Sequence, residues 1–145
     1  MKQNHHKLSL LQPFIGKWST TGKIYATHTA PEIKINGYDT YEWLPGGKML
    51  LHKVNVYIGL ERVQSSELIN YDKLTGNFKI QYIDTHGKEG SFIVLNDDKN
   101  WTFIGKKLRF NGNFSNDNNE LTGNWEQSEN GTDWKRYMEI KLVKD

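Results

Sequence analysis

The sequence of 145 residues contains no cysteine and only three prolines. Without cysteine the chain has no disulfide, no thiolate metal site and no thiol nucleophile, and this composition is typical of a reducing compartment. A chain of this length buries roughly 68–70% of its extended surface, so it folds without such cross-links. We expect a single domain over residues 1–145, with residues 1–6 flexible.

Long hydrophobic runs are also missing. The first ten residues, MKQNHHKLSL, lack the apolar core of a signal peptide. No later stretch approaches the roughly 20 apolar residues that span a membrane as a helix. We therefore expect a cytoplasmic protein that does not act at a membrane.

Neither sign of charge dominates, with 19 lysines and arginines against 17 aspartates and glutamates. The densest basic stretch, Lys106 to Arg109, is short, and the other basic residues are interspersed with acidic ones. Nucleic-acid-binding proteins need a basic stripe because their affinity comes largely from neutralising phosphates. We expect no nucleic-acid partner.

Aromatic residues and glycine are abundant: five Trp, seven Tyr, six Phe and 13 Gly. Aromatic and β-branched residues favour strands, whereas Gly, Asn and Asp favour the tight turns between them. A short helix is expected only at Leu8 to Phe14, where Pro13 limits its length. The remaining pattern predicts strands near 17–27, 33–44, 48–58, 63–72, 77–84, 89–95, 100–105, 107–114, 120–128 and 133–144.

About ten strands joined by short turns indicate an all-β protein. Closing such a meander into an antiparallel barrel removes the sheet edges that promote aggregation. Eight strands already enclose enough room for one small ligand, so a ten-strand barrel is expected to be hollow unless large side chains fill it. An immunoglobulin-like sandwich is the alternative fold.

Several segments resemble known families. Gly16-Lys17-Trp18, after a helical lead-in, resembles the Gly-x-Trp start of the calycins, a group that includes the lipocalins. The chain also resembles a bacterial family of unknown function with lipocalin-like barrels. The segments that carry this second resemblance are Glu42 to Gly47, Asn70 to Asp72, Gly123 to Glu126 and Asp133-Trp134. The resemblance implies a calycin-type barrel but supplies no catalytic residues.

Two better-known barrel families can be compared with the last strand. Fatty-acid-binding proteins grip a carboxylate with an Arg-x-Tyr pair, whereas here Tyr137 follows Arg136 directly. Nitrobindin-like proteins hold haem through a histidine near the end of the chain, and this sequence has none after His86. We therefore expect no cofactor, and we expect no metal site.

Strand alternation assigns Arg136 to an apolar face, together with Trp134, Met138, Ile140 and Leu142. An arginine that points into a barrel needs a partner, because a buried unpaired charge costs several kcal/mol. The partner is either an inward carboxylate, Asp39 or Glu67, or the acidic group of a ligand, unless Arg136 lies exposed at the mouth of the barrel. We favour the salt bridge or the exposed position, and the ligand contact stays open from sequence.

His52 shares a face with Leu50, Val54 and Val56, and we expect it to be a hydrogen-bonded core residue. An enzyme with an interior acid–base site would need His52 within hydrogen-bond reach of Asp39 or Glu67 and open to a cavity. We expect no such pair. The sequence also lacks the recognised nucleophile, phosphate-loop and metalloprotease motifs, and adjacent His5 and His6 point apart. We therefore expect no catalytic residues and no enzyme activity.

The predicted interior cavity is lined mainly by apolar and aromatic side chains. Its lining residues are expected to be Ile24, Tyr41, Trp43, Val54, Tyr82, Phe110, Met138 and Ile140, with Arg136 as the main polar group. The ligand-binding residues are expected to be Arg136, Tyr41, Trp43, His52, Tyr82, Phe110 and Met138.

The sequence thus favours a protein that binds a small apolar or amphipathic molecule, with an acidic head group at Arg136. We expect it to be a monomer or a homodimer. One alternative is a structural or protein-interaction module that uses the outer barrel wall, which requires a contiguous exposed apolar patch or a dimer. The other is a small hydrolase or isomerase.

Overall fold

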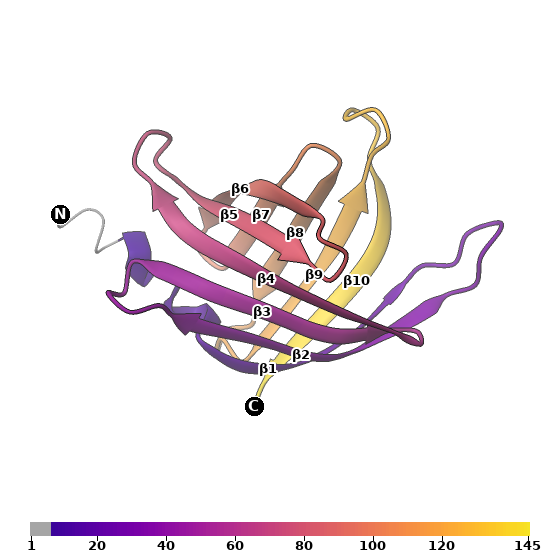
Figure 1. Cartoon of the computed structure of the whole chain (residues 1–145), viewed down its shortest axis with the longest axis horizontal. Coiled ribbons are helices and arrows are strands. Elements are labelled where there is room, and N and C mark those ends of the chain that lie inside the picture. Colours follow the sequence, from indigo (N-terminus) through magenta and orange to yellow (C-terminus); the bar gives the residue numbers. More distant parts are fainter. Residues whose placement is uncertain (1–6) are drawn as a thin grey trace.

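The computed structural model describes residues 7–145, so the predictions made for residues 1–6, His5 and His6 included, lie outside the described residues. The fold is a closed antiparallel barrel of ten strands, preceded by a helical turn at residues 7–9 and the 3-10 helix η1 (Gln12–Phe14) (Figure 1). Within the described range, no helix is long and apolar enough to cross a membrane.

The strands alternate with short turns along the chain. They are β1 (Gly16–Ile24), β2 (Ile33–Trp43), β3 (Met49–Ile58), β4 (Glu61–Asp72), β5 (Asn77–Asp84), β6 (Glu89–Asp97), β7 (Asn100–Ile104), β8 (Leu108–Phe114), β9 (Glu120–Gln127) and β10 (Lys135–Lys144). The predicted all-β meander barrel is confirmed. The main differences are that β1 ends at Ile24 and β10 begins at Lys135, because the turns there are longer than predicted, and that β4 begins at Glu61 and β6 ends at Asp97, because the turns there are shorter.

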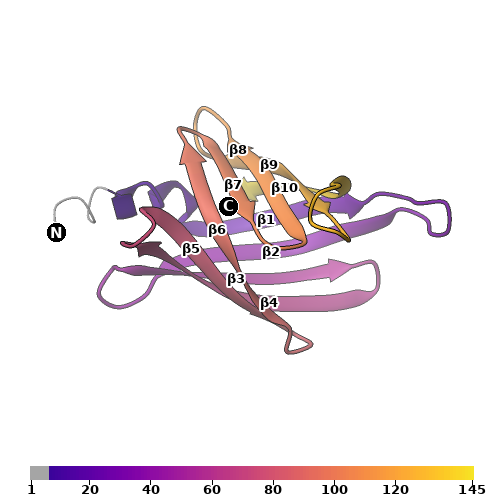
Figure 2. The ribbon, with the colours of Figure 1, turned by 90° about the horizontal axis from the view of Figure 1, so that it is seen from above.

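Each strand pairs with the next, and β1 pairs with β10 to close the barrel. The seam runs in register from Trp18 opposite Lys144 to Ile24 opposite Met138. Seen from above, the strands β1 to β3 run at a steep angle to the strands β6 to β8 across the barrel, as the twist of a closed sheet requires (Figure 2).

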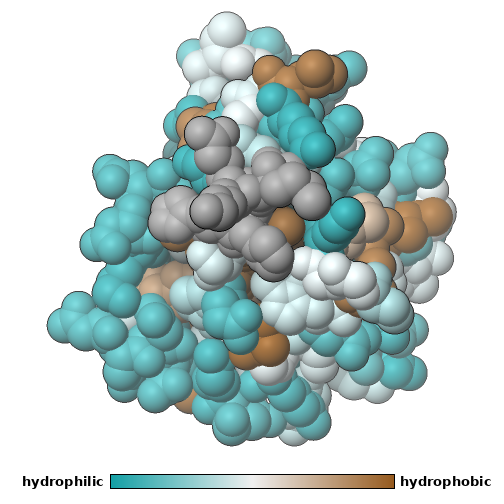
Figure 3. Space-filling view, turned by 90° about the vertical axis from the view of Figure 1, so that its left-hand side faces the viewer, coloured by the Kyte–Doolittle hydropathy of each residue, from teal (hydrophilic) through white to brown (hydrophobic). Residues whose placement is uncertain are grey.

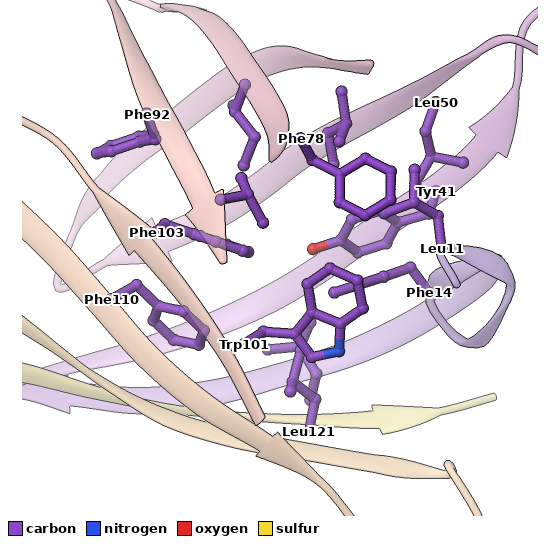
Figure 4. Close-up of a cluster of buried hydrophobic side chains, with 14 of the residues drawn as sticks. Leu11, Phe14, Tyr41, Leu50, Phe78, Phe92, Trp101, Phe103, Phe110 and Leu121 are labelled. Atoms are coloured by element: carbon purple, nitrogen blue, oxygen red, sulfur yellow. The ribbon is translucent and has the colours of Figure 1, made fainter. Parts of the chain in front are cut away.

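The helical lead-in closes one end of the barrel. Trp18 is fully buried there, and its indole Nε1 donates a hydrogen bond to the Phe14 carbonyl at 2.8 Å. The Phe14 ring packs edge-on against Trp101 (Figure 4) and against Phe114, each at 4.9 Å between ring centroids. The structure therefore has the predicted plug, in which Trp18 lies beside the helix.

A second group of aromatic rings lies further along the barrel interior and consists of Phe92, Phe103, Phe110 and Trp125. The Phe110 ring lies against Gly112 of the same strand, β8, and against Gly123 of β9. A Cβ atom at either glycine would collide with the ring. Glycine on the inner face therefore gives this ring the room to lie along the wall. Figure 4 shows Phe92, Phe103 and Phe110 apart from the Phe14 plug.

A β-bulge in β10 changes the direction of its first side chains. Arg136 pairs with Glu126 and Met138 pairs with Trp125, so Tyr137 is the extra residue between two consecutive partners. One extra residue moves the preceding side chains to the other face of the sheet. Arg136 is consequently exposed, and its predicted place inside the barrel is wrong.

Closure of the barrel depends on a close approach at Gly22, which faces Ile140 across the seam. A Cβ atom at Gly22 would collide with the backbone carbonyl of Glu139 and lie 3.1 Å from Cα of Ile140. We predict that Gly22→Ala lowers the free energy of unfolding by about 1–3 kcal/mol, because overpacking forces the seam apart. The outward neighbour Thr21→Ala should change it by less than about 0.5 kcal/mol. Urea unfolding of both variants tests this, and equal effects would contradict it.

Candidate functional site

Three charged or polar side chains meet on the inner wall of the barrel. Asp39, His52 and Glu67 come from the adjacent strands β2, β3 and β4. His52 lies opposite Glu67 in the register, and Asp39 lies opposite Trp18, whose side chain is in the core. Strand alternation therefore directs all three side chains inward.

His52 is hydrogen-bonded through both ring nitrogens. Its Nδ1 lies 2.5 Å from Oε1 of Glu67, and its Nε2 lies 2.6 Å from Oδ2 of Asp39. The exposed fractions of the side chains are 9% for His52, 8% for Asp39 and 13% for Glu67. The expectation that His52 makes no pair with either carboxylate is wrong, whereas its expected place as a hydrogen-bonded core residue is confirmed.

The second carboxylate oxygen of Asp39 is also satisfied. Thr20, which is buried on β1, donates its hydroxyl to Oδ1 of Asp39. The network therefore joins four neighbouring strands, from β1 to β4. Asp39 and Glu67 pair with His52, so the alternative in which either pairs with Arg136 is wrong.

The charge of this network follows from counting protons. Each short contact between a ring nitrogen and a carboxylate oxygen needs one proton, so two contacts require two protons among the three groups. Two carboxylates and one doubly protonated imidazole carry a net charge of −1. The sum is the same wherever along each contact the proton lies.

Electrostatics keep these protons in place at neutral pH. Burial alone would lower the pKa of His52, but the charges of Glu67 and Asp39 and their hydrogen bonds raise it to about 10. The Tyr41 ring stacks on the imidazole with 3.9 Å between centroids, an arrangement that suits a cation over a π face. Burial and the two neighbouring carboxylates raise the pKa of the Tyr41 hydroxyl, which stays neutral.

The geometry limits what the network can do chemically. A histidine acts as a general base through a free ring nitrogen, and both nitrogens of His52 are engaged in hydrogen bonds to carboxylates. In residues 7–145, no group of three or more His, Asp and Glu side chains is arranged to hold a metal ion. The network is instead a fixed patch of negative charge on the inner wall.

This patch lies next to the plug. Tyr41 contacts both His52 and Phe14, whose ring centroids lie 3.9 and 5.1 Å away. Further from the plug, several inward side chains are only half-buried. They are Ile24, Val54, Val63, Ser65, Tyr82, Trp125 and Met138.

The predicted ligand-binding residues other than His52 fall into three places. Tyr41 and Trp43 lie at the plugged end, where the Trp43 Nε1 donates to Oε1 of Gln12 at 3.2 Å. Tyr82, Phe110 and Met138 face inward beyond the His52 network. Arg136 is on the outer wall. Their ligand-binding roles stay predictions.

Sequence reasoning missed two inward residues. Thr20 follows Trp18 by two positions and therefore shares its inward face, a signal that alternation could have supplied. Tyr137 is half-buried, and the neighbouring Tyr82 contributes to raising the pKa of its hydroxyl, after the larger effect of burial. Its inward place depends on the bulge, which no sequence pattern announced.

Arg136 lies between two hollows of the outer wall, with volumes of about 500 and 410 Å³. Asn111 and Asn124 line both of them as well. In the first hollow the charged neighbours are balanced, because Glu139 pairs with Lys23 and Lys141 pairs with Glu120. In the second, Arg109 pairs with Glu126 and lies 4.4 Å from the centroid of the Trp134 ring.

Comparison with known proteins supports the fold. No protein-family model and no curated protein matches the chain. The chain is similar in structure to Rv2717c from M. tuberculosis, with a TM-score of 0.70 and 11% identity over 95% of this chain and 96% of that chain. It also matches a de novo designed fluorescence-activating β-barrel, with a TM-score of 0.45 and 10% identity over 92% and 95% of the two chains. The first likeness supports the barrel fold alone, and the second is too low to add to it.

Removing the histidine leaves two carboxylates buried without a cation between them. We predict that His52→Ala lowers the free energy of unfolding by about 3–5 kcal/mol, the usual effect of breaking a buried ion network. The adjacent outward residue gives a matched control, because Lys53→Ala should change the stability by less than about 0.5 kcal/mol. An effect of His52→Ala as small as that of the control would show that the network does not stabilise the fold.

The raised pKa of His52 also predicts a pH dependence. Its pKa is about 10 in the folded chain and near the ordinary 6.5 when unfolded, so the folded state holds the proton more tightly. The stabilisation is complete below about pH 6.5 and is lost as the pH rises through 10. We predict that the stability difference between wild type and His52→Gln shrinks from pH 6 to pH 10 in urea unfolding. A difference that grows with pH would contradict the charged state of His52.

Proposed function

We propose that the chain binds a small, largely apolar molecule inside the barrel. The observation that carries this proposal is that several inward side chains beyond the plug are only half-buried. Trp18 and Phe14 are at most 1% exposed at the plugged end, whereas inward residues such as Val54 and Met138 are only half-buried. In a closed barrel, an inward side chain is reached by solvent only where the interior is not filled.

The expected acidic head group is not part of this proposal. That expectation rested on Arg136 as an interior cation, and the β-bulge places Arg136 on the outer wall. The charged groups beside the proposed site are Asp39, His52 and Glu67 instead. An apolar molecule with a neutral or cationic polar group suits these surroundings better than an anion.

We also propose a binding protein and not an enzyme. His52 does lie beside two carboxylates, which is the arrangement that an acid–base site would use. Both of its ring nitrogens are occupied, however, and its raised pKa keeps the imidazole protonated at neutral pH. A protonated imidazole between two carboxylates has no lone pair to accept a proton from a substrate. The cytoplasmic location stays a prediction.

An interaction module on the outer wall has less support. Ile93 and Ile104 face each other across β6 and β7, and they are 50% and 39% exposed. Leu95, two residues from Ile93 on the same face, extends this patch. On the face that bears the helical lead-in, hydrophobic residues occur as separate small groups among hydrophilic ones (Figure 3). The patch around Ile93 and the groups on that face are each small compared with the apolar patches that mark protein interfaces.

The interior site is tested with the neutral fluorescent dye N-phenyl-1-naphthylamine. We predict that the wild-type protein increases the dye's fluorescence and that Val54→Phe weakens binding about tenfold or more, because the larger ring occupies the interior. Asn55→Phe is the matched control, since its side chain points outward and is exposed. Equal weakening by both variants, or no dye binding by the wild type, would overturn the proposal.

A further inference from the structure

The carboxylate oxygens of the His52 network differ in whether they can still accept a hydrogen bond. Both oxygens of Asp39 are occupied, one by Thr20 and one by His52. Glu67 uses only Oε1, which pairs with Nδ1 of His52. In the part of the chain that the structure describes, no side chain or backbone group donates a hydrogen bond to Oε2 of Glu67.

This free oxygen is not sealed inside the protein. Among residues 7–145, the one buried side-chain nitrogen or oxygen without a hydrogen-bond partner is Oδ1 of Asn100. The second oxygen of Glu67 is therefore reached by solvent, in keeping with the 13% exposure of the side chain. Because Glu67 points inward, that solvent occupies the interior of the barrel.

The surroundings of Glu67 supply no second cation. The ion pairs of Asp39 and Glu67 within the described residues are those with His52. Apart from His52, the inward side chains next to Glu67 are Ser65 and Ile69 on β4, Val54 on β3 and Tyr82 on β5, and all of them are uncharged. Lys144 also faces the interior, but it lies at the plugged end, where its Nζ donates to the Pro13 carbonyl at 3.1 Å.

The inner wall offers apolar surface beyond this carboxylate. Trp125 packs on Phe92 and Phe110, and the half-buried Met138 lies opposite Trp125 across β9 and β10. An occupant that touches both regions needs an apolar body and one polar end. Its polar end meets a patch of charge −1 whose one free acceptor is a carboxylate oxygen.

We infer that the molecule bound in the barrel carries a cationic group, of the protonated-amine class, and that Glu67 holds this group through Oε2. The inference rests on the proposed interior site and adds the sign of the ligand's charge. An ammonium donates hydrogen bonds to the free carboxylate oxygen and neutralises the excess charge of the network. A carboxylate ligand would meet like charge in a partly dehydrated site and be rejected.

The test compares three amphiphiles with the same eight-carbon chain. Octylammonium, octanol and octanoate are each used at pH 7 to displace N-phenyl-1-naphthylamine from the wild-type protein. Because the apolar chain is constant, differences in displacement report the polar end alone. We expect octylammonium to bind about tenfold more tightly than octanol, and octanoate to bind more weakly than octanol.

The variant Glu67→Gln keeps the shape of the side chain and removes its charge. We expect it to lose the preference for octylammonium while octanol affinity stays within about twofold to threefold. Glu42→Gln, on the exposed outer face of β2, is the matched control and should bind all three molecules as the wild type does. Thermal melting of both variants checks that they are folded.

A second variant covers the case in which Glu67→Gln does not fold. Ser65→Lys adds a cation to the inner wall, two residues from Glu67, and leaves the network itself unchanged. We expect it to reverse the order, so that octanoate binds more tightly than octylammonium.

The outcomes separate the two proposals. Equal affinity of the wild type for all three molecules, or a preference for octanoate, overturns the cationic ligand but leaves interior binding intact. An octylammonium preference that survives Glu67→Gln, or that survives Ser65→Lys where Glu67→Gln does not fold, also overturns it. If neither the dye nor any of the three amphiphiles binds, interior binding itself fails, and the cationic ligand falls with it.

Discussion

The contact of His52 with two carboxylates is the interaction on which the interior of this barrel depends. It brings Glu67 of β4 and Asp39 of β2 to opposite edges of one imidazole ring, at 2.5 and 2.6 Å. Thr20 extends the network to β1, and the Tyr41 ring covers the imidazole on the side of the plug. A group of charges this well ordered is stable inside a protein only because each member is paired with another.

The network also separates two parts of the interior with different roles. On one side, Trp18, Phe14 and Trp101 fill the barrel and are at most 2% exposed. On the other side, Val56 and Phe110 are buried as well, but several inward side chains, Val54 and Met138 among them, are only half-buried. The excess charge of −1 lies at this boundary, and its free acceptor belongs to Glu67. The proposed binding site therefore has a rigid polar floor and apolar walls.

Sequence reasoning predicted much of this arrangement, because turns and strand alternation are local signals. The spacing of Gly, Asn and Asp gave ten strands, and alternation gave the inward direction of Asp39, His52 and Glu67. The register that brings His52 opposite Glu67 is a tertiary property, and the pairing was missed. Arg136 was assigned to the wrong face for a related reason. The bulge at Tyr137 adds one residue to β10, so strand alternation no longer gives the correct face for the residues before it.

The central claim is that a protonated His52 lies between two carboxylates inside the barrel. Nitrogen-15 NMR of the histidine ring tests it most directly, because the two ring nitrogens report their own protonation. We predict that both nitrogens of His52 carry protons at neutral pH and keep them until the pH approaches 10. Loss of one proton near the ordinary pKa of 6.5 would contradict the account, since the network would then lack its cation.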